Sequence, residues 1–277
     1  MLKKIKTYMF APSRRSNSID NEPPPSLEAR GLTLCYGSRP AFEDVTLPVK
    51  AGSITALVGP SGCGKTSFLS CLNRLTDLIP GSRVSGEVRV GGSDVLDPRT
   101  DIIALRRYIG MIFQKPNPFP LSIRKNLEYP LREHNIKDRE QLDRIIEGTL
   151  KDVGLWEDVG HRLDSPALSL SGGQQQRLVL ARALALQPKV LLMDEPCSAL
   201  DPVSSSVVED HILGLRGRYT VLVVTHNLAQ ARRIADNVAL FWIQNGSGRL
   251  VEHASVEQFF QAPQDELTAA YVNGARG

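Results

Sequence analysis

Short runs of apolar residues along this chain are separated by polar turns and by longer amphipathic segments. Residues 54–58, 190–193 and 221–224 are continuous apolar runs, which are typical of strands buried on both faces of a sheet. Further strands are predicted over residues 27–36, 41–49, 87–90, 109–113 and 238–243. The turn Gly37-Ser38 joins the first two of these, and Gly91-Gly92 ends another.

Helices are predicted between these strands, over residues 66–74, 139–153 and 171–186. In the second of them, apolar residues recur at helical spacing. Ser171 is a predicted N-cap of the third helix. Strands that alternate with helices indicate an α/β fold with a mostly parallel sheet and helices on both faces. Between residues 116 and 170 the chain becomes helical and more charged, which indicates an inserted helical region.

The chain begins with a polar segment, residues 1–26, that contains Pro23, Pro24 and Pro25. Its composition predicts a disordered arm, either a solvated tail or a basic contact to anionic lipid. No apolar run approaches the roughly 18 residues of a membrane span, and the start lacks the apolar core of a signal peptide. We therefore expect a soluble or peripheral protein, which acts on a membrane only through a partner.

Charge and cysteine content exclude two further classes of protein. The 33 basic and 30 acidic residues give a net charge of +3, which is too balanced for a nucleic-acid binder. The four cysteines, at positions 35, 63, 71 and 197, show no zinc-ligand spacing. We expect them to be reduced thiols of a cytosolic protein that fill apolar space.

One glycine-rich segment predicts phosphate binding. Gly59-Pro60-Ser61-Gly62-Cys63-Gly64-Lys65-Thr66 matches G-x-x-x-x-G-K-[ST] between a strand and a helix. Glycines let the backbone N–H groups surround phosphate oxygens, and the helix N-terminus adds positive potential. Lys65 is expected to reach the β- and γ-phosphates of ATP and Thr66 to bind Mg²⁺, with Ser67 beside it. A chance glycine-rich turn is the alternative, but the strand and helix on either side disfavour it.

Two carboxylates at the end of a buried strand complete a nucleotide-hydrolysing site. Asp194 and Glu195 follow residues 190–193, and ligands of open α/β sheets bind at such strand ends. Asp194 is expected to hold Mg²⁺, and Glu195 to orient and deprotonate the attacking water. An ordinary solvated strand end is the alternative.

A third motif indicates which class of nucleotide-hydrolysing protein this is. Leu170-Ser171-Gly172-Gly173-Gln174-Gln175-Gln176-Arg177 resembles the signature sequence of ABC ATPases. The resemblance implies that two subunits pair head to tail, so that Ser171, Gly172, Gly173 and Gln174 face ATP bound by the other copy. A plain helix cap explains Ser171 alone, because glycines are poor helix formers at the first turn unless a backbone must approach an anion.

The remaining ABC motifs are also present, in the family's order. Ser198-Ala199-Leu200-Asp201 resembles the D-loop, which connects the two sites of the dimer. Gln114 resembles the glutamine that senses Mg²⁺ and water, His226 the switch histidine that contacts the γ-phosphate, and Tyr36 the aromatic residue that stacks on adenine. By this resemblance Glu195, His226, Lys65 and Gln114 are catalytic, and Thr66, Gln114 and Asp194 bind the metal.

The resemblance also implies the domain organisation. It predicts a P-loop NTPase (RecA-like) core with an antiparallel β subdomain and an inserted α-helical subdomain. The ABC ATPase domain is expected over residues 27–268, with the helical subdomain at about 116–178 and a C-terminal tail at 269–277.

Three segments resemble ATPases of phosphate import. They are residues 113–120, with three prolines, residues 71–81, and residues 171–178. Three features depart from the common pattern: Cys197, the order Thr66-Ser67, and a turn over residues 244–248 that looks long and is expected to touch no phosphate-binding position. The stiff proline segment follows Gln114, so it can pass nucleotide state to a membrane partner; a rigid loop that joins two subdomains is the alternative, and both can hold.

We therefore expect the ATPase of a phosphate importer at the cytoplasmic face of the inner membrane. Its partners are expected to be a second copy, two membrane-spanning permease subunits and, indirectly, a phosphate-binding protein, with no nucleic acid. Three alternatives remain: another small solute such as an amino acid or a phosphonate, a non-transport ABC ATPase, and a regulatory module that binds ATP without hydrolysis.

Overall fold

A computed structural model describes residues 26–274 of the chain. The predicted N-terminal arm, except for Ser26, and the last three residues of the predicted tail lie outside the described residues.

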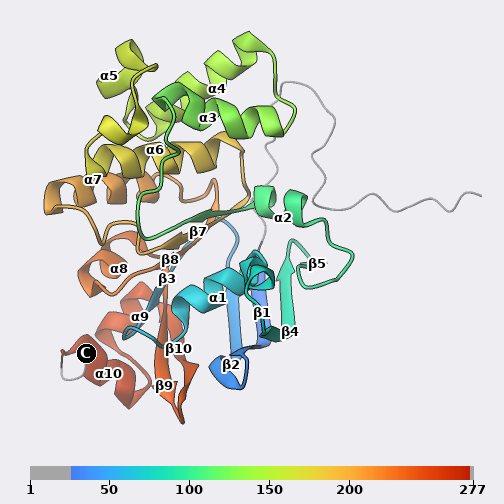
Figure 1. The fold of residues 1–277 in the computed structure, drawn as a ribbon. Coiled ribbons are helices and arrows are strands. Elements are labelled where there is room, and N and C mark those ends of the chain that lie inside the picture. Colours follow the sequence, from blue (N-terminus) through green and yellow to red (C-terminus); the bar gives the residue numbers. More distant parts are fainter. Residues whose placement is uncertain (1–25, 275–277) are drawn as a thin grey trace, which may run out of the picture.

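The described residues form one ten-stranded sheet, in the order β5-β4-β1-β2-β10-β9-β3-β8-β7-β6 (Figure 1). The strands are β1 (Leu27–Tyr36), β2 (Arg39–Val49), β3 (Ile54–Val58), β4 (Ser82–Val90), β5 (Ser93–Asp94), β6 (Ile109–Ile112), β7 (Val190–Asp194), β8 (Thr220–Val224), β9 (Asn237–Gln244) and β10 (Ser247–Ser255).

Only one half of the sheet is parallel. Strands β9, β3, β8, β7 and β6 pair in parallel, whereas β5, β4, β1 and β2 pair antiparallel. Strand β10 connects the halves, because it pairs antiparallel with β9 and in parallel with β2. The expectation of a mostly parallel sheet is therefore corrected, whereas the α/β core with an antiparallel β subdomain is confirmed.

The helices are α1 (Lys65–Leu72), α2 (Ile102–Tyr108), α3 (Ile123–Glu133), α4 (Arg139–Asp152), α5 (Trp156–Val159), α6 (Gly172–Ala185), α7 (Pro202–Leu213), α8 (Leu228–Ile234), α9 (Val256–Gln261) and α10 (Glu266–Val272). Short 3₁₀ turns are η1 (Leu75–Leu78), η2 (Gly160–Arg162) and η3 (Ala167–Ser169). Helices α3, α4 and α5 gather above α6 at one end of the molecule (Figure 1).

The central strands separate two apolar cores. In β3, Ile54, Ala56 and Val58 face the core shared with the helical region, whereas Leu57 faces the core that contains Phe68 of α1. Every residue of β3 is buried, so the strand lacks the alternation of apolar and polar residues that marks a strand with one exposed face. This confirms the interpretation of continuous apolar runs as strands buried on both faces.

Several predicted boundaries shift for local reasons. The helix predicted over residues 66–74 ends at Leu72, because Arg74 has a left-handed backbone with φ of 58°. Strand β4 begins at Ser82 rather than at residue 87, and it pairs with Tyr36 through a polar stretch that lacks an apolar signal. The predicted helix over 171–186 is α6, with Ser171 as its N-cap.

Candidate active site

The glycine-rich loop follows β3 and leads directly into α1. Gly59, Gly62 and Gly64 have φ of 133°, 82° and 94°, which are conformations that L side chains rarely adopt. A Cβ atom at Gly59 would lie 2.0 Å from the Phe241 carbonyl oxygen. No side chain of the described residues caps α1, so its first N–H groups remain available for an anion.

Lys65 carries a buried positive charge within this loop. The residue is 6% exposed, and Nζ donates to the carbonyl oxygens of Gly59 and Pro60, both at 2.7 Å. Among residues 26–274 no carboxylate lies within ion-pair distance of this ammonium. Asp194 acts on this charge only from beyond ion-pair distance. Since a buried charge without a close counter-ion is costly, the loop fits an anionic ligand such as a phosphate group.

Thr66 and Asp194 bring two oxygen ligands together at the end of β7. The Thr66 hydroxyl donates to Asp194 Oδ1 at 3.0 Å. Burial, the largest cause, raises the pKa of Asp194, and the neighbouring Glu195 adds to the effect. Mg²⁺ is usually held by one or two carboxylates together with substrate phosphates and water. This pair of oxygens therefore fits Mg²⁺, although the described residues contain no cluster of three or more acidic, histidine or cysteine ligands.

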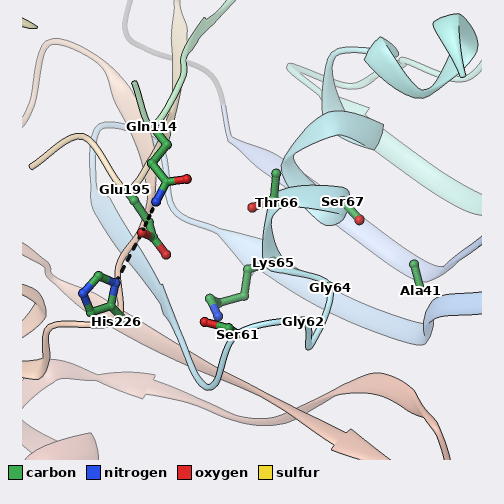
Figure 2. Close-up of a pocket in the computed structure, with 10 residues that line it drawn as sticks. All are labelled: Ala41, Ser61, Gly62, Gly64, Lys65, Thr66, Ser67, Gln114, Glu195 and His226. Atoms are coloured by element: carbon green, nitrogen blue, oxygen red, sulfur yellow. Dashed lines mark hydrogen bonds and ion pairs between the residues drawn. The ribbon is translucent and has the colours of Figure 1, made fainter. Parts of the chain in front are cut away.

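Glu195 is the centre of a second cluster on the same pocket. Gln114 Nε2 donates to Glu195 Oε2 at 2.8 Å, and His226 Nδ1 lies 3.3 Å from the same oxygen. Figure 2 shows these three side chains side by side, with Lys65 and Thr66 across the pocket. They come from the ends of β6, β7 and β8, which is the position that parallel strands give to ligand-binding residues.

The backbone of Glu195 is held in an unusual conformation. Its φ of 47° is left-handed, which costs about 1–3 kcal/mol for a residue with a side chain. The Glu195 N–H donates to the Val224 carbonyl oxygen at 3.0 Å, and its own carbonyl oxygen accepts from the Ser198 hydroxyl at 3.0 Å. The end of β8 and the D-loop therefore fix the direction of this carboxylate.

The glycine-rich loop, with Lys65 and Thr66, and the cluster around Glu195 line one pocket of about 560 Å³, a volume in the usual range for small ligands. The residues around it are Ala41, Ser61, Gly62, Gly64, Lys65, Thr66, Ser67, Gln114, Glu195 and His226. Tyr36 lies beside it, with its hydroxyl 3.4 Å from Ser67 Oγ. Its predicted stacking on adenine remains a prediction.

The signature motif lies outside this pocket, at the start of α6. Ser171 and Gln174 form a capping box, in which each side chain bonds the other's backbone N–H. A Cβ atom at Gly173 would lie 2.8 Å from Ser204 of α7, so packing explains that glycine. Among residues 26–274, a Cβ atom at Gly172 would meet no atom closer than 3.8 Å, so no described neighbour requires glycine there. Gly172 is therefore consistent with a backbone that an external anion approaches.

Comparison with known proteins places this geometry in a family. The chain matches the family model described as ABC transporter over residues 42–198. It is 59% identical, over 251 residues, to the phosphate import ATP-binding protein PstB 1 of Nitrosococcus oceani, and the match covers 91% of each chain. The chain belongs to the ABC transporter family of ATP-binding proteins. No helix within residues 26–274 of this ABC protein is long and apolar enough to cross a membrane.

The structure brings together most of the residues predicted for the ABC site. Much of the P-loop, Gln114, Glu195 and His226 line one pocket, whereas Ser171 to Gln174 do not reach it. Asp194 does not line the pocket itself but accepts a hydrogen bond from Thr66, which does. Asp201 caps α7 by accepting from the N–H groups of Val203 and Ser204, and the bonds from Ser204 lower its pKa. The four cysteines are free thiols, as expected.

The expectation for the turn over residues 244–248 was wrong. The connection between β9 and β10 is the two-residue turn Asn245-Gly246, whose φ angles of 52° and 83° are typical of a tight hairpin. The segment also contacts the P-loop, because a Cβ atom at Gly248 would lie 2.1 Å from the Cys63 carbonyl oxygen. No local signal marks this contact, since the two residues are far apart in the sequence.

We expect Gly248→Ala to weaken ATP binding, because the P-loop backbone must move to admit the methyl group. Overpacking of this kind costs about 1–3 kcal/mol, so ATP affinity or the free energy of unfolding falls by that amount. ATP titration and thermal unfolding of the purified chain measure the two effects. Gly148→Ala in α4 is the matched control, because no atom in the described part of the chain lies within 4 Å of its added Cβ. Equal behaviour of the two variants would argue against close support of the P-loop by β10.

Proposed function

We propose that this ABC protein is the ATP-hydrolysing subunit of an importer of inorganic phosphate. The observation that carries the hydrolytic part is the position of Glu195, held between Gln114 and His226 and facing the P-loop. The relative from Nitrosococcus oceani is named for phosphate import, and 59% identity over nearly the whole chain supports the same cargo here.

In this proposal the glycine-rich loop and its neighbours bind the phosphates and the metal, and the Glu195 cluster activates the water. Lys65 and the P-loop amides bind the β- and γ-phosphates, while Thr66, Asp194 and Gln114 hold Mg²⁺, which supplies positive charge to the phosphate oxygens when bound. Glu195 accepts a proton from the attacking water. The oxygen of that water bonds to the γ-phosphorus while the bond from the γ-phosphorus to the β-phosphate oxygen breaks. His226 contacts the γ-phosphate beside it.

The complete site in this proposal includes a second copy of the chain. Ser171, Gly172 and Gly173 lie away from their own P-loop, so they serve ATP bound by the partner copy. The capping box uses the N–H groups of Ser171 and Gln174, so the N–H groups of Gly172 and Gly173 and the positive potential of the helix start serve that γ-phosphate. ATP thereby closes the dimer, and hydrolysis opens it. The dimer works at the cytoplasmic face of the inner membrane with two permease subunits and a phosphate-binding protein.

Removal of Mg²⁺ is expected to abolish turnover. With excess EDTA, ATP hydrolysis by the purified chain falls ~100-fold or more, because charge stabilisation by the metal is worth several kcal/mol. Phosphate release measured before and after Mg²⁺ is restored checks this. Turnover that persists in EDTA would rule out the metal role of Thr66 and Asp194.

Uptake competition tests the cargo. In cells that depend on this chain, uptake of labelled phosphate at limiting external concentration should be suppressed by excess unlabelled phosphate and unaffected by amino acids or phosphonates. Competition by one of those solutes instead would assign that cargo to the same ATPase. Non-transport and purely regulatory functions are disfavoured by the uninterrupted cassette and by the intact Glu195 cluster.

A further inference from the structure

Arg182 of the signature helix α6 is a partly buried cation that has no acidic partner among the described residues. Burial lowers the pKa of its guanidinium, and within residues 26–274 no carboxylate lies at ion-pair distance. Nη2 donates instead to the backbone and side-chain oxygens of Asn117, at 3.1 and 3.2 Å. The guanidinium carbon also lies 4.2 Å from the centre of the Phe119 ring. Arg182 therefore fastens α6 to the proline segment.

Asn126 of α3 strengthens this junction. It is fully buried, and its Nδ2 donates to the Phe119 and Ser122 carbonyl oxygens at 3.1 and 3.0 Å. Its Oδ1 accepts from the Phe119 N–H at 2.7 Å and from Arg182 Nη1 at 3.4 Å. A buried network whose members are all bonded is rigid, so the segment and α6 move together.

The connection from Asn117 back to Gln114 is stiff. Pro116, Pro118 and Pro120 fix their own φ angles, and each restricts the residue before it, so every residue from 115 to 120 is constrained. A displacement of Asn117 is therefore passed to Gln114, which donates to Glu195. At the other end, Ser171 lies eleven residues before Arg182 on the same helix, roughly 16 Å along its axis.

We propose that Arg182 is a positioning residue that couples the two ATP sites of the dimer. The inference rests on the proposed function, in which Ser171 of one chain faces the partner's ATP. Binding of that ATP to the start of α6 shifts Arg182, and through the proline segment it sets Gln114 against Glu195 in the chain's own site. Each ATP therefore prepares the other site for hydrolysis.

The test compares ATP dependence of hydrolysis for the full chain and its Arg182→Gln variant. We expect the native chain to show a Hill coefficient above one. The variant should show a coefficient near one and turnover lower by about fivefold or more, the usual size of coupling between sites. ATP affinity of the isolated chain without Mg²⁺ should stay within twofold, because Arg182 does not touch the pocket. Arg132→Gln, which removes an exposed ion pair on α3, is the matched control and should match the native chain.

Phe119→Leu supplies an independent variant, since it removes the ring under the guanidinium at an exposed position, where we expect the substitution to cost little stability. It should lower the Hill coefficient in the same direction. The double variant with Arg182→Gln should be no worse than Arg182→Gln alone, because both act through one contact. Arg182→Lys should fail to restore coupling, because lysine lacks the planar fork.

The outcomes separate this inference from the proposed function. A native Hill coefficient of one, native-like kinetics in both variants, or additive losses in the double variant would overturn the coupling role. If Arg182→Gln fails to fold, the Hill coefficient and turnover of Phe119→Leu alone test the coupling role. The absence of ATP hydrolysis by the native chain, or full activity of Glu195→Gln, would instead overturn the proposed function.

Discussion

Glu195→Gln should bind ATP with native affinity and lose turnover by a factor of ~100 or more. Glutamine has the shape of glutamate and keeps contact with Gln114 and His226, but it cannot accept a proton from water. Lys65, Thr66 and Asp194, which meet the phosphates and metal, are unchanged. Single-turnover hydrolysis and ATP titration of the purified chain measure the two quantities separately.

Glu147→Gln is the control for this substitution. Glu147 is an exposed glutamate of α4 that pairs with Lys151, away from the pocket. Its loss should leave turnover within about twofold, because exposed ion pairs contribute little. If Glu195→Gln retained turnover within tenfold of the native chain, Glu195 would not be the general base, and another group would have to activate the water.

Ser171→Arg should block hydrolysis almost completely while a single chain still binds ATP. Ser171 is exposed at the start of α6 and lies outside the pocket of its own chain, so the P-loop is untouched. An arginine there places bulk and positive charge where the partner's γ-phosphate must fit, and it removes an N-cap worth about 1 kcal/mol. Nucleotide titration at low protein concentration and steady-state hydrolysis test the two parts.

Ser255→Arg is the control that separates obstruction of the partner's ATP site from the loss of a helix N-cap. Ser255 is also an exposed N-cap serine, because its hydroxyl accepts from the Gln258 N–H at the start of α9. This control should lose similar stability and keep its turnover. Weak ATP binding by the Ser171→Arg monomer would contradict the role of α6 across the interface.

Local chemistry explains how much of the site the sequence predicts. Phosphate loops need glycines and a lysine at fixed spacing, so the conformation of residues 59–66 can be predicted from that segment alone. The ends of parallel strands meet at one edge of a sheet, which made the position of Glu195 predictable from its own segment. The places of Gln114 and His226 were implied only by the resemblance to ABC ATPases. The left-handed backbone of Glu195 carries no such signal, because non-glycine residues seldom adopt it.

Contacts between distant segments could not be predicted in this way. The place of β10 between β2 and β9 depends on packing of segments some 200 residues apart, and so does the contact of Gly248 with Cys63. Arg182 reads as one more polar residue of an amphipathic helix, and its partner Asn117 as part of a proline-rich loop. Their hydrogen bond joins residues 65 positions apart, so no local pattern indicates it.

The most direct test of the account is phosphate uptake at limiting external phosphate. Cells that lack this chain are resupplied with the native chain, with Glu195→Gln, or with neither, at equal expression. We predict that only the native chain restores uptake, because import needs hydrolysis at the Glu195 site. Equal uptake in all three, or full restoration by Glu195→Gln, would contradict the claim that ATP hydrolysis by this chain drives phosphate import.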